Sequence, residues 1–174
     1  VIVDRMAADG DVDVMDALAF RLPVQVIGEL VGVPPSDRDQ FRTLVRASAA
    51  ALEPGVTAEQ IDEAEHAMAI MDDYFRSLIK RRRASLEHDL VSALIAARDG
   101  EDRLSEDEMV ATLILLFAAG FETTTNLIGN GLVALAGNPL QKQRLIEHPD
   151  LIKTAVEEIL RFESSNQLGN RMTT

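Results

Sequence analysis

Hydrophobic and polar residues recur along much of the chain with the spacing of amphipathic helices. The clearest case follows Thr57, where apolar residues return every three or four positions and so fall on one face of an α-helix. Thr57 and Gln60 predict a capping box at its start. The apolar positions are Ile61, Ala64, Met68, Met71, Phe75 and Leu78.

A second pattern covers residues 106–136, where the chain is apolar on every side of an expected helix. Ser105 and Glu108 predict a capping box at its start, and Gly137 followed by Pro139 predicts its end. A helix of this length spans about 46 Å. Its unbroken apolar run is too short for a membrane span, and Glu122 lies near the centre. We therefore expect this helix to be buried inside a large protein.

Similar patterns predict helices over residues 13–31, 37–52 and 150–162, and no segment predicts a strand with comparable strength. The expected fold class is all-α. The net charge of −12 disfavours nucleic acid and anionic membranes as partners. The chain contains no cysteine, which excludes disulfides and thiolate chemistry within it.

The centre of the long helix carries Gly120, Glu122, Thr123 and Thr124. Glycine costs about 1 kcal/mol against alanine inside a helix, and threonine hydroxyls compete for helix carbonyls. These residues could open a polar notch in which a carboxylate and a hydroxyl relay protons. By helix physics alone, a flexible core helix whose threonines bond their own backbone explains them equally well.

Three other sets of charged residues are weaker candidates. Glu158 and Arg161 lie three residues apart and can pair on a helix, most simply as an exposed ion pair. Arg171 stands in an irregular tail and could bind a carboxylate, although a solvated side chain is the simpler explanation. Residues 80–83 are basic and end a predicted helix, which indicates a solvated helix end.

Neither a metal site nor a dinucleotide site is predicted. The histidines His66, His88 and His148 lack metal-ligand spacing among themselves, and we expect them at the surface. Residues 129–134 fit a glycine-rich dinucleotide fingerprint, but they lie deep inside a predicted helix rather than between a strand and a helix.

Two motifs in sequence order resemble those of soluble, bacterial-type cytochrome P450 enzymes, the haem-thiolate monooxygenases. The family's long central helix carries a small residue, glycine, any residue, an acid and threonine. Here these are Ala119, Gly120, Phe121, Glu122 and Thr123. The Glu-x-x-Arg of a later helix is matched by Glu158 and Arg161, and residues 22–34 look like the segment before the family's lid helices. The resemblance covers essentially all 174 residues.

The resemblance implies catalytic roles for Glu122 and Thr123. Both would lie where oxygen is activated, with Thr123 holding the oxygen species through its hydroxyl and Glu122 helping to deliver protons. Ala119 and Gly120 would let oxygen approach the haem face. The residues expected to pack on haem or substrate are Leu115, Leu116 and Ala118.

The resemblance also implies structural and binding roles. Glu158 and Arg161 would form a structural pair beneath the haem, and Arg171 would pair with a haem propionate. Helices within 37–83 would form a lid over the substrate cavity, which residues 166–168 would line.

Some features depart from the family. The thiolate ligand of the iron has no counterpart here, because the chain has no cysteine, and Ser165 stands where proline is common. We therefore expect residues 1–174 to be the central helical segment of a mainly α cytochrome P450 fold, with most of the β-structure missing. Such a fragment would be inactive alone, would bind haem weakly or not at all, and would tend to self-associate through exposed apolar patches.

The implied function is that of an oxidoreductase, a haem-dependent monooxygenase that hydroxylates an apolar small molecule. It would take electrons from a ferredoxin-type donor in the cytoplasm. Two alternatives stay open at this point. One is a non-catalytic all-α interaction module, and the other is a haem-binding relative without monooxygenase activity.

Overall fold

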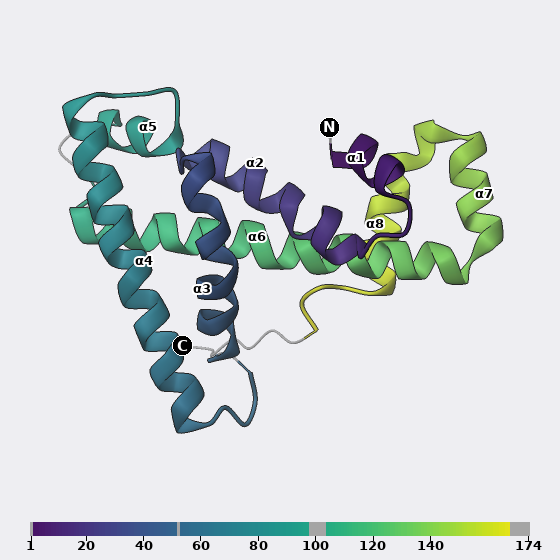
Figure 1. The fold of residues 1–174 in the computed structure, drawn as a ribbon, viewed down its shortest axis with the longest axis horizontal. Helices are drawn as coiled ribbons and strands as arrows, with labels where there is room; N and C mark the ends of the chain where they lie inside the picture. The colour runs from purple at the N-terminus through teal and green to yellow at the C-terminus, as the bar shows by residue number, and fades with distance from the viewer. Residues whose placement is uncertain (1, 52, 98–103, 168–174) are drawn as a thin grey trace, which may run out of the picture. The chain divides into compact units, whose positions relative to one another are not determined.

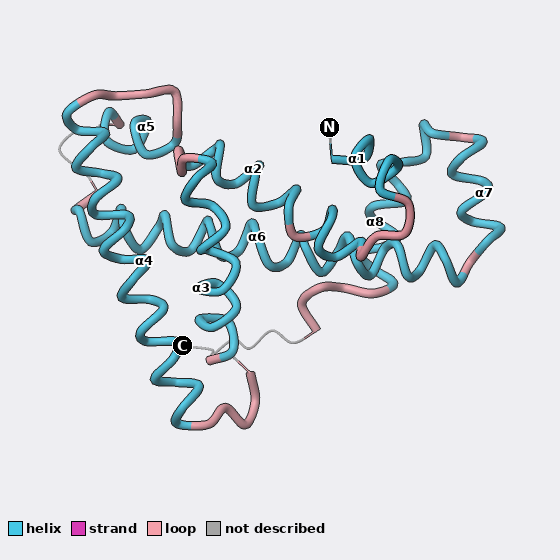
Figure 2. Tube along the Cα trace, viewed as in Figure 1, coloured by secondary structure: helices cyan, strands magenta, loops and turns pink. Residues whose placement is uncertain are grey.

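Helices are the only regular elements among residues 2–51, 53–97 and 104–167, which are the residues that the computed structural model describes (Figure 2). The all-α prediction is therefore confirmed. In chain order (Figure 1) the elements are α1 (Ile2–Asp9), η1 (Met15–Ala19), α2 (Arg21–Val31), η2 (Pro35–Asp37), α3 (Arg38–Ala50), α4 (Ala58–Ala84), α5 (Leu90–Ala96), α6 (Glu106–Gly137), α7 (Pro139–Glu147), η3 (Pro149–Leu151) and α8 (Ile152–Phe162).

The helix starts lie where the local signals predict them. At α4, Gln60 donates its amide to the Thr57 hydroxyl, and the Gln60 side chain accepts from the Thr57 amide. At α6, Ser105 and Glu108 make the same reciprocal pair of bonds, at 2.7 and 3.2 Å. Each box satisfies helix amides that would otherwise lack partners.

Contacts between residues divide the chain into two compact units. The central unit is Leu22–Glu122, and the split unit combines Val1–Arg21 with Thr123–Thr174. Helix α6 runs through the boundary, so its first half belongs to the central unit and its second half to the split unit.

The core of the central unit is an aromatic cluster where α3, α4 and α6 meet. Phe41, Phe75 and Phe117 are fully buried, and the Phe41 ring lies 4.4 Å from that of Phe117 and 5.6 Å from that of Phe75, between centroids. Tyr74 meets Phe41 edge to face at 5.0 Å. Burying rings in such tilted pairs removes a large apolar area from water, which holds these three helices together.

The basic end of α4 corrects one expectation from the sequence, because Arg82 is buried rather than solvated. Its guanidinium pairs with Asp89, and it donates to the Gly32 carbonyl at 3.0 Å. Gly32 has a φ of +98° and lies directly against the Asp89 carboxylate, so a side chain at this position would clash. This network joins the end of α2, the end of α4 and the start of α5.

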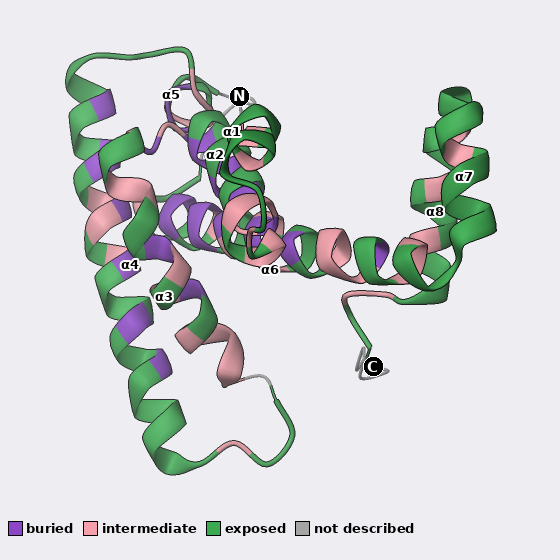
Figure 3. Ribbon diagram, turned by 45° about the vertical axis from the view of Figure 1, so that its right-hand side comes forward, coloured by how far each residue is buried: buried purple, intermediate pink, exposed green. Residues whose placement is uncertain are grey.

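Two glycines on α6 mark close helix contacts in the split unit. A Cβ at Gly129 would lie 2.8 Å from the sulfur of Met15 in η1, and one at Gly131 would lie 3.2 Å from side-chain atoms of Ile159 in α8. Because glycine has no side chain, Met15 and Ile159 can approach the α6 backbone closely at these two positions. Most of α7 and α8 is exposed (Figure 3).

Helix α6 runs without interruption from Glu106 to Gly137, so the predicted opening around Gly120 is absent. The helix is long and apolar enough to cross a membrane by those two criteria alone. One of its faces is buried, however, and packs on the helices of the central unit through Leu113, Phe117 and Phe121. This arrangement is typical of a core helix.

Candidate functional site

Helix α6 presents two different apolar faces near its centre. Phe117 and Phe121 belong to the buried core, whereas Leu115 is 67% exposed and Ala119 is also exposed. Residues four apart lie on one face of a helix, so Leu115, Ala119 and Thr123 form a single open face. Leu116 lies beside this open face and is 40% exposed. The face is apolar at Leu115 and Ala119 and ends at Thr123, which carries a hydroxyl.

Gly120 and Ala118 lie between these faces and are half-buried. A Cβ at Gly120 would lie 3.1 Å from Cδ1 of Ile27, so α2 approaches the α6 backbone at this point. The glycine thus has a packing reason within the central unit. It lets α2 and α6 come close together.

Glu122 follows the open face and is half-buried. Burial raises the pKa of its carboxyl above the ordinary value, Arg46 of α3 lowers it in part, and Glu53 in the loop after α3 raises it further. A carboxyl with a raised pKa holds its proton more readily near neutral pH, which suits a group that must give and regain protons. The positive charge of Arg46 on α3 therefore affects the pKa of Glu122 on α6.

Thr123 is exposed and begins the part of α6 that belongs to the split unit. Its carbonyl accepts a hydrogen bond of 2.7 Å from the hydroxyl of Ser165, in the segment after α8. About two turns further along α6, Asn130 donates to the carbonyl of Glu163 at 3.2 Å. These two bonds hold the segment after α8 against α6.

Thr125 has the most deeply buried side chain on this part of α6, at 1% exposure. Its hydroxyl makes no hydrogen bond to any described residue. A buried hydroxyl without a partner costs stability, so it is a place where an ordered water would fit the chemistry.

Glu158 and Arg161 pair as the sequence predicts. The Arg161 guanidinium donates two bonds of 2.8 and 2.6 Å to the Glu158 carboxylate. This bond lowers the pKa of Glu158. Both side chains are largely exposed, so the pair is not buried within the described part of the chain.

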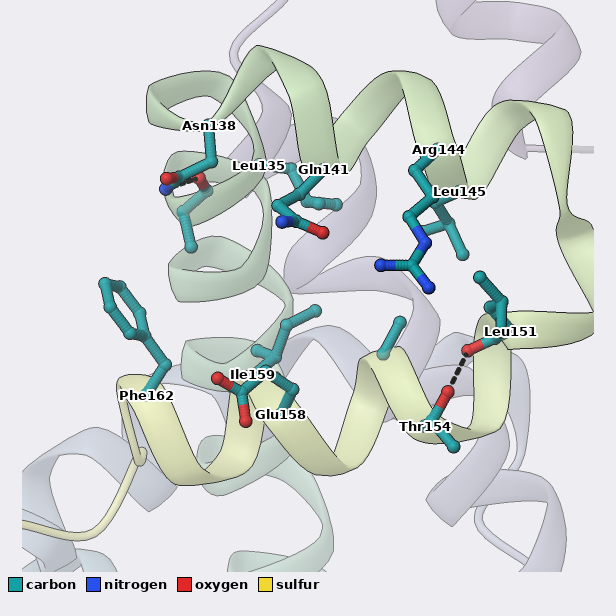
Figure 4. A pocket seen from close by; sticks show the side chains of 12 residues that line it. Leu135, Asn138, Gln141, Arg144, Leu145, Leu151, Thr154, Glu158, Ile159 and Phe162 are labelled. Atoms are coloured by element: carbon teal, nitrogen blue, oxygen red, sulfur yellow. Dashed lines mark hydrogen bonds between the residues drawn. The ribbon is translucent and has the colours of Figure 1, made fainter.

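The Glu158 side chain also lines a cavity of about 510 Å³ between the end of α6, α7 and α8 (Figure 4). The cavity has an apolar floor that includes Leu135, Leu145 and Ile159, while Gln141 and Arg144 reach in from α7. Its residues come from Ala134 onward, so along α6 it begins well beyond Thr123.

The structure thus brings Leu115, Ala119, Glu122 and Thr123 together on adjacent turns of one helix. Arg171 and Leu168 lie outside the described residues. No group of three or more histidine, aspartate or glutamate side chains that could hold a metal ion is found among the residues that are described.

Two contacts of the site could not be predicted from local sequence. Arg46 acts on Glu122 from another helix, and Ser165 reaches Thr123 from a segment far along the chain. Neither residue forms a motif with its target, and the only signal at Ser165 was a departure from a proline that is common in the family.

Comparison with known proteins decides the family. The model of the family described as Cytochrome P450 matches residues 54–168. The chain belongs to the cytochrome P450 family. Among curated P450 relatives, it is 46% identical over 160 residues to a vitamin D(3) 25-hydroxylase of Pseudonocardia autotrophica, covering 91% of this chain and 38% of that protein. It is 35% identical over 173 residues to a biotin biosynthesis cytochrome P450 of Bacillus subtilis, covering 99% and 44%.

Solved structures of P450 enzymes give the same result. P450BioI, in complex with an acyl carrier protein bearing hexadec-9Z-enoic acid, matches with a TM-score of 0.88 at 34% identity, over 93% of this chain and 41% of that one. CYP109E1 of Bacillus megaterium in complex with testosterone matches with a TM-score of 0.79 at 30% identity, over 92% and 43%. The chain therefore spans about two fifths of the length of the P450 proteins it matches.

Proposed function

We propose that the complete protein is a haem-dependent monooxygenase that inserts oxygen into an apolar small molecule. The family membership supports the reaction class. Among the relatives, one is named for vitamin D(3), and solved neighbours hold testosterone or an acyl chain, all largely apolar molecules. For this chain, the observation that carries the proposal is the open apolar face of α6, which leads directly to an acid and a threonine.

The residues of this face fit one side of a haem. Leu115 and Leu116 offer exposed aliphatic surface, and Ala119 is small enough for a flat ring system to approach the helix. Haem supplies the redox-active iron at which dioxygen is reduced. These 174 residues contain no cysteine, so they would supply surface for the haem but no thiolate ligand for its iron.

Glu122 and Thr123 are the proposed catalytic residues. The hydroxyl of Thr123 can both donate and accept a hydrogen bond and would hold a proton close to the reacting oxygen. Glu122 holds a proton more readily than an ordinary glutamate because it is partly desolvated, and it can pass that proton from solvent towards the site. Ala118 and Gly120 complete the α6 surface, with Gly120 fixing the approach of α2.

Other predicted residues take supporting roles in this proposal. Glu158 and Arg161 form the structural pair, and Arg171 pairs with a haem propionate. The helices of residues 37–83, which are α3 and all of α4 except its last residue, form a lid over the substrate cavity. Because Arg46 lies on α3, movement of that helix would change the charge that Glu122 experiences.

A ferredoxin-type protein is the proposed electron donor, and the cytoplasm the proposed location. A carrier-bound substrate is a further option, since P450BioI is seen with an acyl carrier protein. The 174-residue chain alone would be inactive. We expect it to self-associate, because large apolar side chains such as Leu115 and Val133 are exposed. A sharp, concentration-independent unfolding transition of a monomer would contradict that expectation.

The test uses the complete gene product. Haem content, and oxygen-dependent hydroxylation of a panel of steroids and fatty acids, would be measured with a ferredoxin and its reductase. We expect one haem per chain, and we expect Thr123→Ala to keep its haem while the yield of product per electron falls about tenfold or more. Absence of haem, or a complete sequence without cysteine, would overturn the proposal and favour a non-catalytic helical module.

A further inference from the structure

The segment after α8 is hydrogen-bonded to α6 at Thr123, one of the two proposed catalytic residues. The Ser165 hydroxyl donates to the carbonyl of Thr123 at 2.7 Å, while the neighbouring tie from Asn130 to Glu163 is longer, at 3.2 Å. All four residues belong to the split unit. The Ser165 contact therefore ends on the main chain of Thr123, the residue to which the proposed function gives a catalytic hydroxyl.

We propose that Ser165 is a positioning residue for Thr123. By holding the Thr123 carbonyl, the serine fixes the orientation of this peptide unit and, with it, the direction of the threonine side chain. The role in catalysis rests on the proposed function of Thr123, whereas the contact and its effect on α6 do not.

The local chemistry gives Ser165 this influence. A carbonyl oxygen can accept two hydrogen bonds, and within a continuous helix one of them comes from the amide four residues on, here that of Leu127. Ser165 supplies the second donor. Three successive threonines follow Glu122, and threonine is a poor helix former, so this turn is weak by itself. An outside donor can therefore decide its geometry.

The contact also depends on the residue type. Proline, common at this position in the family that the sequence resembles, has neither a hydroxyl nor an amide hydrogen to donate. A chain with proline here cannot make this bond. Ser165 therefore distinguishes this chain from relatives that carry the proline, and it links the segment proposed to line the substrate cavity to the proposed catalytic threonine.

The first experiment measures amide hydrogen exchange in the complete protein. In Ser165→Ala, the amides of residues 124–128 should exchange about fivefold faster than in the parent, the factor expected for one lost hydrogen bond. Ser165→Thr should restore the parent rate, because it keeps the hydroxyl. Ser165→Pro should behave like Ser165→Ala and serves as a second donor-free variant, should the alanine variant fail to fold.

The control is Ser164→Ala. The Ser164 hydroxyl accepts a local hydrogen bond of 3.3 Å from the Asn166 amide and so stabilises only its own turn. This variant should leave exchange in α6 unchanged. Equal effects of Ser164→Ala and Ser165→Ala, or failure of Ser165→Thr to restore the parent rate, would overturn the proposal.

The second readout is the share of consumed oxygen that appears in product, measured with the haem-loaded protein. Ser165→Ala should lower this share about twofold or more with KM unchanged, because a misplaced threonine affects the reaction and not substrate binding. A purely structural anchor would change haem content and KM instead. A parent protein without haem would overturn the proposed function, and hydrogen exchange would then decide by itself whether Ser165 positions the Thr123 peptide.

Discussion

The two units of this chain bury their side chains to very different extents, although α6 runs through both. Every one of the largest fully buried side chains, from Val31 to Phe121, belongs to the central unit. In the described part of the split unit, Ala19, Thr125 and Gly131 are the buried residues, and all three are small. The first half of α6 thus buries one face in a core and leaves Leu115 and Leu116 exposed on the other, whereas the second half buries no large side chain among the described residues.

The buried contacts of the central unit are made within this chain, whereas the exposed apolar side chains are available to bind other groups. The aromatic cluster and the Arg82–Asp89 ion pair both lie entirely within the central unit. The exposed apolar surface of α6, α7 and α8 needs a cover, and burial of such surface is worth about 25 cal/mol per Å². In our account that cover is haem, substrate and the rest of the protein.

The largest expected effect contrasts two phenylalanines. Phe117→Ala should lower the free energy of unfolding by about 3–5 kcal/mol, because it opens a cavity in the aromatic cluster. Phe162→Ala, at a residue that is 58% exposed, should cost less than about 1 kcal/mol in the 174-residue chain. Urea unfolding of the parent and of both variants measures these losses in the free energy of unfolding. Equal losses would mean that the two units are packed alike.

The next effect tests the buried ion pair. Asp89→Asn should destabilise the protein by about 3 kcal/mol at pH 7, because Arg82 loses a buried partner. Asp62→Asn, at an exposed position on α4, should change little.

The pH dependence of this pair has a defined sign. Burial alone would raise the pKa of Asp89, but bonds from Ser92 and Arg82 bring it below its ordinary value of 3.8. A depressed carboxyl pKa adds stability that is present above the ordinary value and is lost as the pH falls through the folded value. Thermal unfolding should therefore show the difference between parent and Asp89→Asn shrinking below about pH 4. A constant difference would contradict the pairing.

A smaller effect of opposite sign is expected at the site. The pKa of Glu122 is raised, so its contribution to stability is full below the ordinary pKa and is lost as the pH rises through the folded value. Glu122→Gln should therefore stabilise the protein slightly at pH 7, by less than about 1 kcal/mol, and should give no gain at pH 4. In the complete protein it should lower product yield. Glu63→Gln, exposed on α4, is the matched control.

The smallest effect concerns the exposed pair on α8. Glu158→Gln should leave the unfolding temperature of the 174-residue chain unchanged, because both partners are well solvated. In the complete protein the same substitution should reduce haem content, if the pair is structural there as proposed. Glu157→Gln, at the neighbouring exposed position, should do neither. A clear loss of stability in the chain alone would show that the pair already supports this fold.

Local signals explain why the sequence predicted the helices well. Capping boxes at Thr57 and Ser105 involve residues three apart, and the apolar stripe of α4 repeats within each turn. The burial of Arg82 could not be predicted in this way, because the basic residues around it are typical of a solvated helix end. Its partners, Gly32 and Asp89, come from other parts of the chain.

The candidate site shows the same limit. The order of Ala119, Glu122 and Thr123 within one helix was enough to predict that they lie together. The packing role of Gly120 could not be predicted, because it depends on Ile27 of another helix. The opening of α6 that was expected around Gly120 is absent. The sequence of an all-apolar helix does not show which face stays exposed, because tertiary packing against other helices decides this.

Whether the open face of α6 receives haem is tested by Ala119→Phe. A bulky ring at this exposed position should weaken haem binding by the complete protein at least about tenfold, because it fills the space that the haem needs. It should leave the unfolding free energy of the 174-residue chain unchanged, and Ala136→Phe, exposed near the end of α6, should affect neither. Normal haem binding by Ala119→Phe would contradict the account.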